Sequence, residues 1–176
     1  LFTVQALLAR MHLYSRNWSK AEQYAVQVIN SGMYESEPLD KVFLKESKSA
    51  LWQLKPEIDG GNSAEAFAYI FTTAPATQVR LSSFFNDCFE SGDLRKEQWV
   101  RLIGTGTEDA HPYKYRVRGS TAPSKEYSVI IRIEEMYLIA AETAAELGEL
   151  QSCSDMLNVL RSRAGLEALQ FKDRET

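Results

Sequence analysis

The feature that most constrains this chain is a periodic apolar pattern between Arg132 and Leu166. Apolar or small residues recur there at the i, i+3, i+4, i+7 spacing that places them on one face of a helix. The members of the first stripe are Ile133, Met136, Tyr137, Ala140, Ala141, Ala144 and Leu147. After a break at Gly148, the second stripe comprises Cys153, Met156, Leu157, Leu160 and Ala164. The spacing predicts two amphipathic helices that form an antiparallel hairpin with facing apolar stripes.

A second helical hairpin is predicted over residues 1–32. Its first helix would bury one apolar face, formed by Val4, Leu7, Leu8 and Met11. Its second helix would bury Ala21, Tyr24, Ala25 and Val28, and Gly32 is suited to follow the helix end in a left-handed conformation. One constant shift aligns this hairpin with the later one, and each resembles a tetratricopeptide unit. Because the two are far apart in sequence, either the chain between them folds back or further chain supplies more repeats.

The middle segment, residues 33–125, is less regular and rich in aromatic residues. The composition of 50–55 and 66–71, bounded by Gly and Pro, predicts short strands. Residues 81–90 predict a short helix, and alternation over 113–118 predicts an exposed strand. The aromatic and sulfur-containing residues expected to form the buried face of the short helix are Phe84, Phe85, Cys88 and Phe89.

The expected fold is therefore mostly α, with tetratricopeptide-like helical hairpins and an irregular, loop-rich middle segment. The length of 176 residues fits one domain, 1–176, with hairpins at 1–32 and 126–176. The first residue is Leu1 rather than Met and already lies in a helical pattern, so we expect the chain to be part of a larger protein.

Charge and composition argue against several function classes. A net charge of −4 gives no electrostatic basis for binding nucleic acid or an anionic membrane. No apolar run approaches the length of a bilayer span. Two cysteines and two separated histidines, His12 and His111, provide neither a disulfide framework nor a ligand set, so no metal site and no cofactor are predicted.

No catalytic residues are predicted either. The sequence has no Ser/His/Asp order and no Gly-x-Ser-x-Gly elbow. Glu135, Glu142 and Glu146 are the best candidates for paired acids, because their spacing places them near one helix face. On a single helix beside Arg132, ion pairing or solvation accounts for them better than hydrolysis.

Aromatic residues offer the more informative signal. Trp52, flanked by leucines, is expected in the core. Tyr69, Phe71 and Trp99 fall in or near loops, where flat rings stack on sugars as readily as on protein. For each of them taken alone, core packing is the favoured interpretation and sugar stacking the alternative.

Two groups of residues in the later hairpin, taken with their spacing, resemble the signature of the SusD/RagB family, which comprises surface nutrient-binding lipoproteins of Bacteroidetes. The first is Arg132-x-x-Glu135-x-Tyr137-Leu138-Ile139-x-Ala141-Glu142, and the second is Leu157-Asn158-x-x-Arg161-x-Arg163-Ala164-Gly165-Leu166. Further segments agree in order, namely Ser49–Leu54, Asp93-Leu94-Arg95 and Lys114–Arg118. Leu94 stands where the family's turn has proline.

The resemblance implies a helical scaffold that captures a nutrient, most often an oligosaccharide, without altering it chemically. It implies a location at the extracellular face of the outer membrane, through a lipid anchor that is not within these residues. The implied partner is a SusC-like TonB-dependent transporter. The alternative is a tetratricopeptide-type protein–protein interaction scaffold, and a helical carbohydrate-active enzyme is a weaker third reading.

Ligand specificity in such proteins resides in variable loops, so no binding residue carries over from the family. We expect the ligand in the 59–80 region, at Tyr69, Phe71, Gln78 and Arg80. The rings would stack on the sugar, and the Gln and Arg side chains would bind its hydroxyls. A separate hypothesis is that Arg132, Glu142 and Arg161 form ion pairs that hold the signature helices together.

Overall fold

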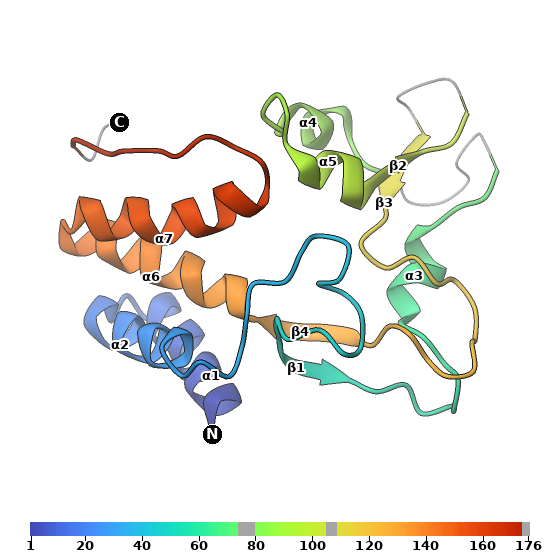
Figure 1. Ribbon diagram of the computed structural model, residues 1–176, viewed down its shortest axis with the longest axis horizontal. Coiled ribbons are helices and arrows are strands. Elements are labelled where there is room, and N and C mark those ends of the chain that lie inside the picture. The colour runs from blue at the N-terminus through green and yellow to red at the C-terminus, as the bar shows by residue number, and fades with distance from the viewer. Residues whose placement is uncertain (74–79, 105–108, 174–176) are drawn as a thin grey trace.

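The structure is a computed structural model that describes residues 1–73, 80–104 and 109–173. Two helical hairpins lie on one side of the molecule, and they are formed by α1 (Phe2–Tyr14), α2 (Trp18–Ile29), α6 (Ile133–Leu147) and α7 (Leu150–Arg163). On the other side lie α3 (Ala64–Tyr69), α4 (Ser83–Asp87), α5 (Leu94–Trp99), β2 (Val100–Leu102) and β3 (Ala110–Pro112) (Figure 1). Between them run β1 (Ala50–Leu54) and β4 (Ser128–Arg132). The expected mostly α fold with an irregular middle is confirmed.

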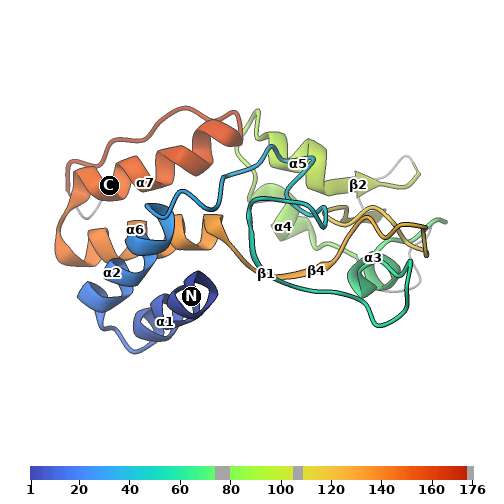
Figure 2. The same ribbon diagram turned by 60° about the horizontal axis from the view of Figure 1, so that its bottom comes forward.

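The two hairpins pack directly against each other. Helix α2 contacts both α1 and α6, and α6 in turn contacts α7 (Figure 2). The chain between the hairpins therefore folds back and returns through β4 into α6. Of the two arrangements that the sequence allows, this is the one the structure contains.

Small side chains allow the helices to approach closely. Alanines form the contact surfaces of α1, α2 and α6, and the fully or almost fully buried ones are Ala6, Ala9, Ala21, Ala25 and Ala140. Larger residues, including Val28, Met136 and Ile139, fill the space around them. Gly148 ends α6 with a φ of +83°, so the predicted break falls where a left-handed residue is needed.

The face predicted for the first helix is wrong. Val4 and Met11 are 60% and 59% exposed, whereas Ala6 and Ala9 are fully buried. The reason is steric, because the close contact with α2 admits only small side chains. Val4, Leu7 and Met11 therefore lie on the exposed side of the helix.

A two-stranded antiparallel sheet joins the two sides of the molecule. Strand β1 pairs with β4, which places Trp52 opposite Ile131. Ser49 is bound to the start of α6, since its carbonyl accepts a hydrogen bond of 2.9 Å from the Ile133 amide. The β1 strand is confirmed, but Trp52 is 41% exposed, so its predicted place in the core is wrong.

The tryptophan in the core is Trp99. It is 9% exposed, and its indole Nε1 donates a hydrogen bond of 2.9 Å to the Leu39 carbonyl. Its ring lies edge-on to Phe43, with 5.5 Å between centroids, and Phe43 also contacts Tyr115 at 5.1 Å. For Trp99, core packing is thus the correct one of the two alternatives, and this cluster is a second core beneath the irregular part.

Two predicted strands are absent. Residues 64–69 form α3 instead of the strand expected over 66–71. Residues 113–118 are irregular, because Glu126 takes the backbone amides that a strand would use. Its carboxylate accepts hydrogen bonds from the amides of Arg116 and Val117, at 2.8 and 2.9 Å.

A buried carboxylate joins the hairpin to this second core. Glu134 is 3% exposed and accepts hydrogen bonds from Arg163 and from the Ser49 hydroxyl, the latter at 3.0 Å. Arg132 lies 3.3 Å from its other oxygen and stacks over the Phe43 ring. Removing any one of these three charged side chains would leave a buried charge without its partner and destabilise the fold.

The hypothesis of an Arg132–Glu142–Arg161 set is therefore wrong in its partners. Arg132 pairs with Glu134, and Arg161 pairs with Glu90 at 2.6 Å. Glu142 is exposed. Among the described residues, neither arginine forms an ion pair with it.

Candidate functional site

The predicted ligand-binding residues lie at different places in the irregular part. Tyr69, at the end of α3, is 42% exposed and lines a pocket of about 220 Å³. Phe71 packs against His111, with 4.5 Å between ring centroids. Arg80 lines a separate pocket, and Gln78 lies outside the described residues. The structure therefore places Tyr69 and Arg80 at pockets but does not bring them into the same one.

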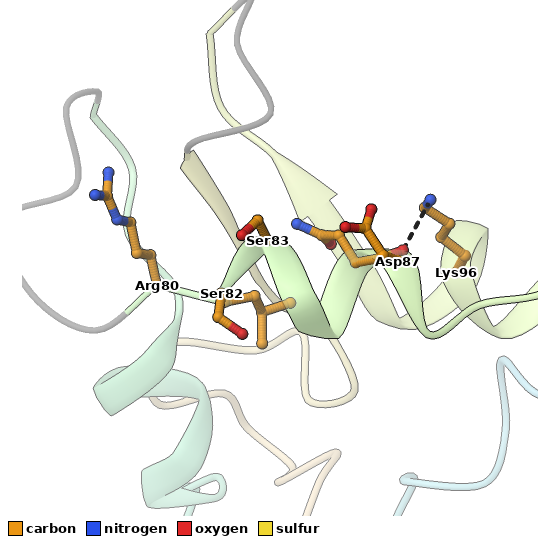
Figure 3. Close-up of a pocket in the computed structure, with 7 residues that line it drawn as sticks. Arg80, Ser82, Ser83, Asp87 and Lys96 are labelled. Carbon is orange, nitrogen blue, oxygen red and sulfur yellow. Dashed lines mark hydrogen bonds between the residues drawn. The ribbon is translucent and has the colours of Figure 1, made fainter.

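The pocket beside Arg80 is polar and measures about 640 Å³. Helix α4 and its N-cap residue line the middle of this pocket, with Arg80 at one end and Lys96 of α5 at the other (Figure 3). Ser83 and Asp87, one helical turn apart, lie between them. The Lys96 ammonium donates a hydrogen bond of 3.2 Å to the Asn86 carbonyl, which fixes this wall. We call this the polar pocket.

The other side of α4 borders an apolar pocket of about 480 Å³. Phe85 and Phe89 lie edge to face there, with 5.3 Å between ring centroids. The burial predicted for this helix is wrong, because Phe84 and Phe85 are 77% and 42% exposed. A helix of five residues covers too little protein to bury an aromatic face, and here that face borders a pocket.

These pockets adjoin one another. Leu81 lines both the polar and the apolar pocket. Pro112 and Lys114 line both the apolar pocket and the one beside Tyr69. We refer to the polar, apolar and Tyr69 pockets together as the pocket row. The two larger volumes fall within the range of roughly 300–1,000 Å³ that is usual for small-molecule sites.

The centre of the pocket row is anchored to the second core. Trp99 lines the apolar pocket from its buried position, and the Lys114 ammonium lies 5.4 Å from the centroid of its ring. Desolvation lowers the pKa of Lys114, and the nearby charges of Arg132 and Arg95 lower it further. Desolvation also raises the pKa of Tyr115, whose hydroxyl accepts a hydrogen bond of 2.8 Å from the Val129 amide. Such shifts mark a site where charge is poorly solvated.

His111, on β3, is fully buried, and neither of its ring nitrogens has a hydrogen-bond partner among the described residues. Desolvation lowers the pKa of this imidazole, and the charge of Arg101 on the paired strand adds to the effect. Its ring is held between Phe71 and Tyr113. The histidine therefore packs as a neutral ring under the strands that support the pocket row.

The pocket row has the chemistry of a binding site. The described residues contain no group of three or more His, Cys, Asp or Glu side chains that could hold a metal ion. Cys88 and Cys153 are both unpaired thiols, and burial raises the pKa of Cys153. Among those same residues, no helix combines the length and the apolar character needed to cross a bilayer.

Several residues of the pocket row were not predicted as site residues. Phe85 and Phe89 were assigned to a buried face, and Lys114 to an exposed strand. A signal for the phenylalanines is present in the sequence, since three of them fall within residues 84–89 and Gly92 and Asp93 follow closely, so a helix there must be short. A helix this short covers too little of the protein to bury its phenylalanines. No sequence signal marks Lys114, because its position depends on the distant Trp99.

Known structures with this architecture include several SusD proteins. A SusD superfamily protein from Parabacteroides distasonis superimposes with a TM-score of 0.78 at 18% identity, covering 98% of this chain and 46% of that chain. A SusD-like carbohydrate binding protein from Bacteroides vulgatus gives 0.72 at 25% identity, with 98% and 39% covered. Surface glycan-binding protein A from Bacteroides uniformis gives 0.72 at 18% identity, with 97% and 43% covered. The chain thus spans less than half the length of these structures.

The fold and the pocket row define a helical-hairpin protein with a row of neighbouring pockets in its irregular part. In sequence, residues 105–176 match the model of the SusD family. This match covers less than half of the chain, and together with the shared fold it supports the resemblance to the SusD/RagB family. A comparison with curated proteins finds no match.

Proposed function

We propose that this chain belongs to a protein that captures an oligosaccharide at the bacterial surface and passes it, chemically unaltered, to a SusC-like TonB-dependent transporter. The ligand binds along the pocket row. The protein is held by a lipid anchor at the extracellular face of the outer membrane. The observation that carries the proposal is that the three pockets are neighbours that share lining residues, because an oligosaccharide is an extended row of rings that can occupy adjacent pockets.

The lining of the pockets suits a sugar. Phe85 and Tyr69 present rings that stack on the apolar faces of pyranoses, and they lie in pockets joined through Pro112. In the polar pocket, Ser83 and Asp87 offer a hydroxyl and a carboxylate to sugar hydroxyls. Two of the similar solved structures are described as carbohydrate-binding and glycan-binding proteins, which supports the same ligand class here.

Binding without hydrolysis is supported by the carboxylates of the pocket row. Glycoside hydrolysis usually needs two carboxyl groups about 5–10 Å apart across one sugar site. Among the described lining residues, the polar pocket has Asp87, the Tyr69 pocket has Glu65, and the apolar pocket has neither Asp nor Glu. Glu65 is also engaged, since it accepts a hydrogen bond of 2.7 Å from the Ser128 hydroxyl.

A matched pair of phenylalanines on α4 tests the proposal. Phe85 lines the apolar pocket, whereas its neighbour Phe84 is 77% exposed and is not among the pocket's lining residues. After a glycan array identifies a bound oligosaccharide, calorimetric titration of F85A should show affinity reduced by about 3- to 10-fold, the loss expected for one ring stack of about 0.5–1.5 kcal/mol. F84A should bind as the unaltered chain does. Equal affinities for all three proteins would contradict binding in the pocket row.

A protein-interaction scaffold is the second candidate, and one observation favours it. Helix α1 exposes Val4, Leu7 and Met11 along one side, and their exposed fractions are 60%, 41% and 59%. Exposed apolar residues on one helix are a common feature of protein-binding surfaces. If this were the functional surface, no glycan on the array would bind, and F85A would have no effect to measure.

A further inference from the structure

One cation in the pocket row has no acidic partner among the residues that the structure describes. Lys114 lines both the apolar and the Tyr69 pocket, so it borders the place where these two pockets adjoin. Its Nζ atom lies 5.4 Å from the centroid of Trp99 and 5.8 Å from that of Phe43. Within residues 1–73, 80–104 and 109–173, no carboxylate forms an ion pair with it. Ring faces alone therefore compensate its charge.

The acidic groups around it are used by other partners. Asp93 pairs with Arg95 at 2.6 Å, and the Glu126 carboxylate accepts backbone amides. Glu65, in the Tyr69 pocket, accepts the Ser128 hydroxyl. Desolvation and the charges of Arg132 and Arg95 lower the pKa of Lys114, in accord with a local excess of positive charge. This excess occurs in a chain whose net charge is −4.

We propose that the ligand of the pocket row is an acidic oligosaccharide, and that Lys114 binds a carboxylate or sulfate group on one of its sugars. This inference rests on the proposed function and narrows its ligand class. A negative group beside Lys114 replaces the lost hydration of the ammonium group and offsets the repulsion from the arginines. A ring stacked against Phe85 in the apolar pocket places a substituent within reach of Lys114, because both residues line that pocket.

The first test asks which glycans bind the chain. An array that carries neutral, uronate-containing and sulfated oligosaccharides is expected to show binding to the acidic ones, with preference weakening as salt is added. Binding to neutral glycans only would overturn the inference and leave the proposed function standing. Binding to no glycan at all would overturn the proposed function and the inference with it.

The second test isolates the charge on the ligand. If a uronate is bound, tetragalacturonate is compared by calorimetry with its methyl ester, which keeps the backbone and removes the charge. If a sulfated glycan is bound, a carrageenan tetrasaccharide is compared with its desulfated form. The charged member of the pair should bind about tenfold more tightly, as one charge-assisted contact would provide. Equal affinity of the two members would contradict the role of Lys114.

The third test isolates the charge on the protein. K114Q should lose about tenfold in affinity for the charged ligand and change little toward its neutral counterpart, whereas K114R should retain most of the affinity. K20Q is the control, because Lys20 is exposed on α2, in the hairpins, and its substitution alters net charge equally. Thermal unfolding of each variant establishes that it is folded. If K114Q weakens charged and neutral ligands alike, Lys114 acts through packing and the proposal is wrong.

Discussion

The helical hairpins and the pocket row use apolar residues in opposite ways. In the hairpins, the alanines of α1 and α2 are buried completely, and the helices contact each other along their length. In the pocket row, a five-residue helix leaves Phe84 and Phe85 exposed beside open pockets. The hairpins thus bury small side chains to gain rigidity, and the irregular part keeps large rings accessible.

The two regions are connected through ionic and aromatic contacts. Glu134, at the start of α6, binds Arg163 and Arg132, and these arginines stack over Trp99 and Phe43 of the second core. A rigid hairpin therefore holds the floor of the apolar pocket. The buried alanines between α1 and α2 lie outside this connection and are not among the residues that line the apolar pocket, so substitutions there should change stability and leave binding in the pocket row largely unchanged.

The largest effect on stability is expected from E134Q. The change removes the charge that compensates Arg132 and Arg163, and breaking such a buried pair costs about 3–5 kcal/mol. Chemical denaturation should report this loss in the free energy of unfolding. E142Q is the matched control on the same helix, because Glu142 is exposed, and its effect should stay within about 0.5 kcal/mol. Similar losses for both variants would show that the network does not stabilise the hairpin.

A smaller effect is expected from overpacking the interface between α1 and α2. Ala9 is fully buried there, so A9L should lower the free energy of unfolding by about 1–3 kcal/mol. M11Q, on the exposed side of the same helix, should be nearly neutral. If the M11Q change proved the more harmful of the two, the assignment of the faces of α1 would be reversed.

The smallest effect is on the pH dependence of stability, and it comes from His111 on β3. Because the pKa of His111 is lowered in the folded chain, the unfolded chain takes up a proton first as pH falls below about 6.5. Acid therefore favours unfolding, by at most about 1.4 kcal/mol per pH unit, down to the lowered pKa. H111F should remove this contribution, whereas H12Q should retain it. Parallel stability curves for H111F and the unaltered chain between pH 7.5 and 5.5 would contradict the assignment.

Periodicity made the hairpins predictable. The stripes of α6 and α7 and the break at Gly148 follow from residue spacing and from the conformational freedom of glycine. The face of α1 was not predictable in this way, because the close approach of α2 makes alanine, and not the larger Leu7, the contact residue. Residues 66–71 were misassigned as a strand, since a short apolar run fits a strand and a short helix equally well.

The binding surface was predictable only in part. Tyr69 and Arg80 do line pockets, which follows from their place in an aromatic, loop-rich segment. Trp52 is exposed, contrary to its prediction, whereas Trp99 is in the core, and its burial depends on Phe43 and Leu39, which lie far away in sequence. Contacts of this kind are set by tertiary packing and leave no local pattern.

The most direct test of the account is nuclear magnetic resonance of the 19.9 kDa chain titrated with a glycan that it binds. Backbone amide shifts are predicted to change in α3, α4 and β3, around Tyr69, Phe85 and Lys114, while those of α1 and α2 stay fixed. Chemical-shift changes centred on α1 and β1, with none along the pocket row, would contradict the claim that the irregular part binds the ligand.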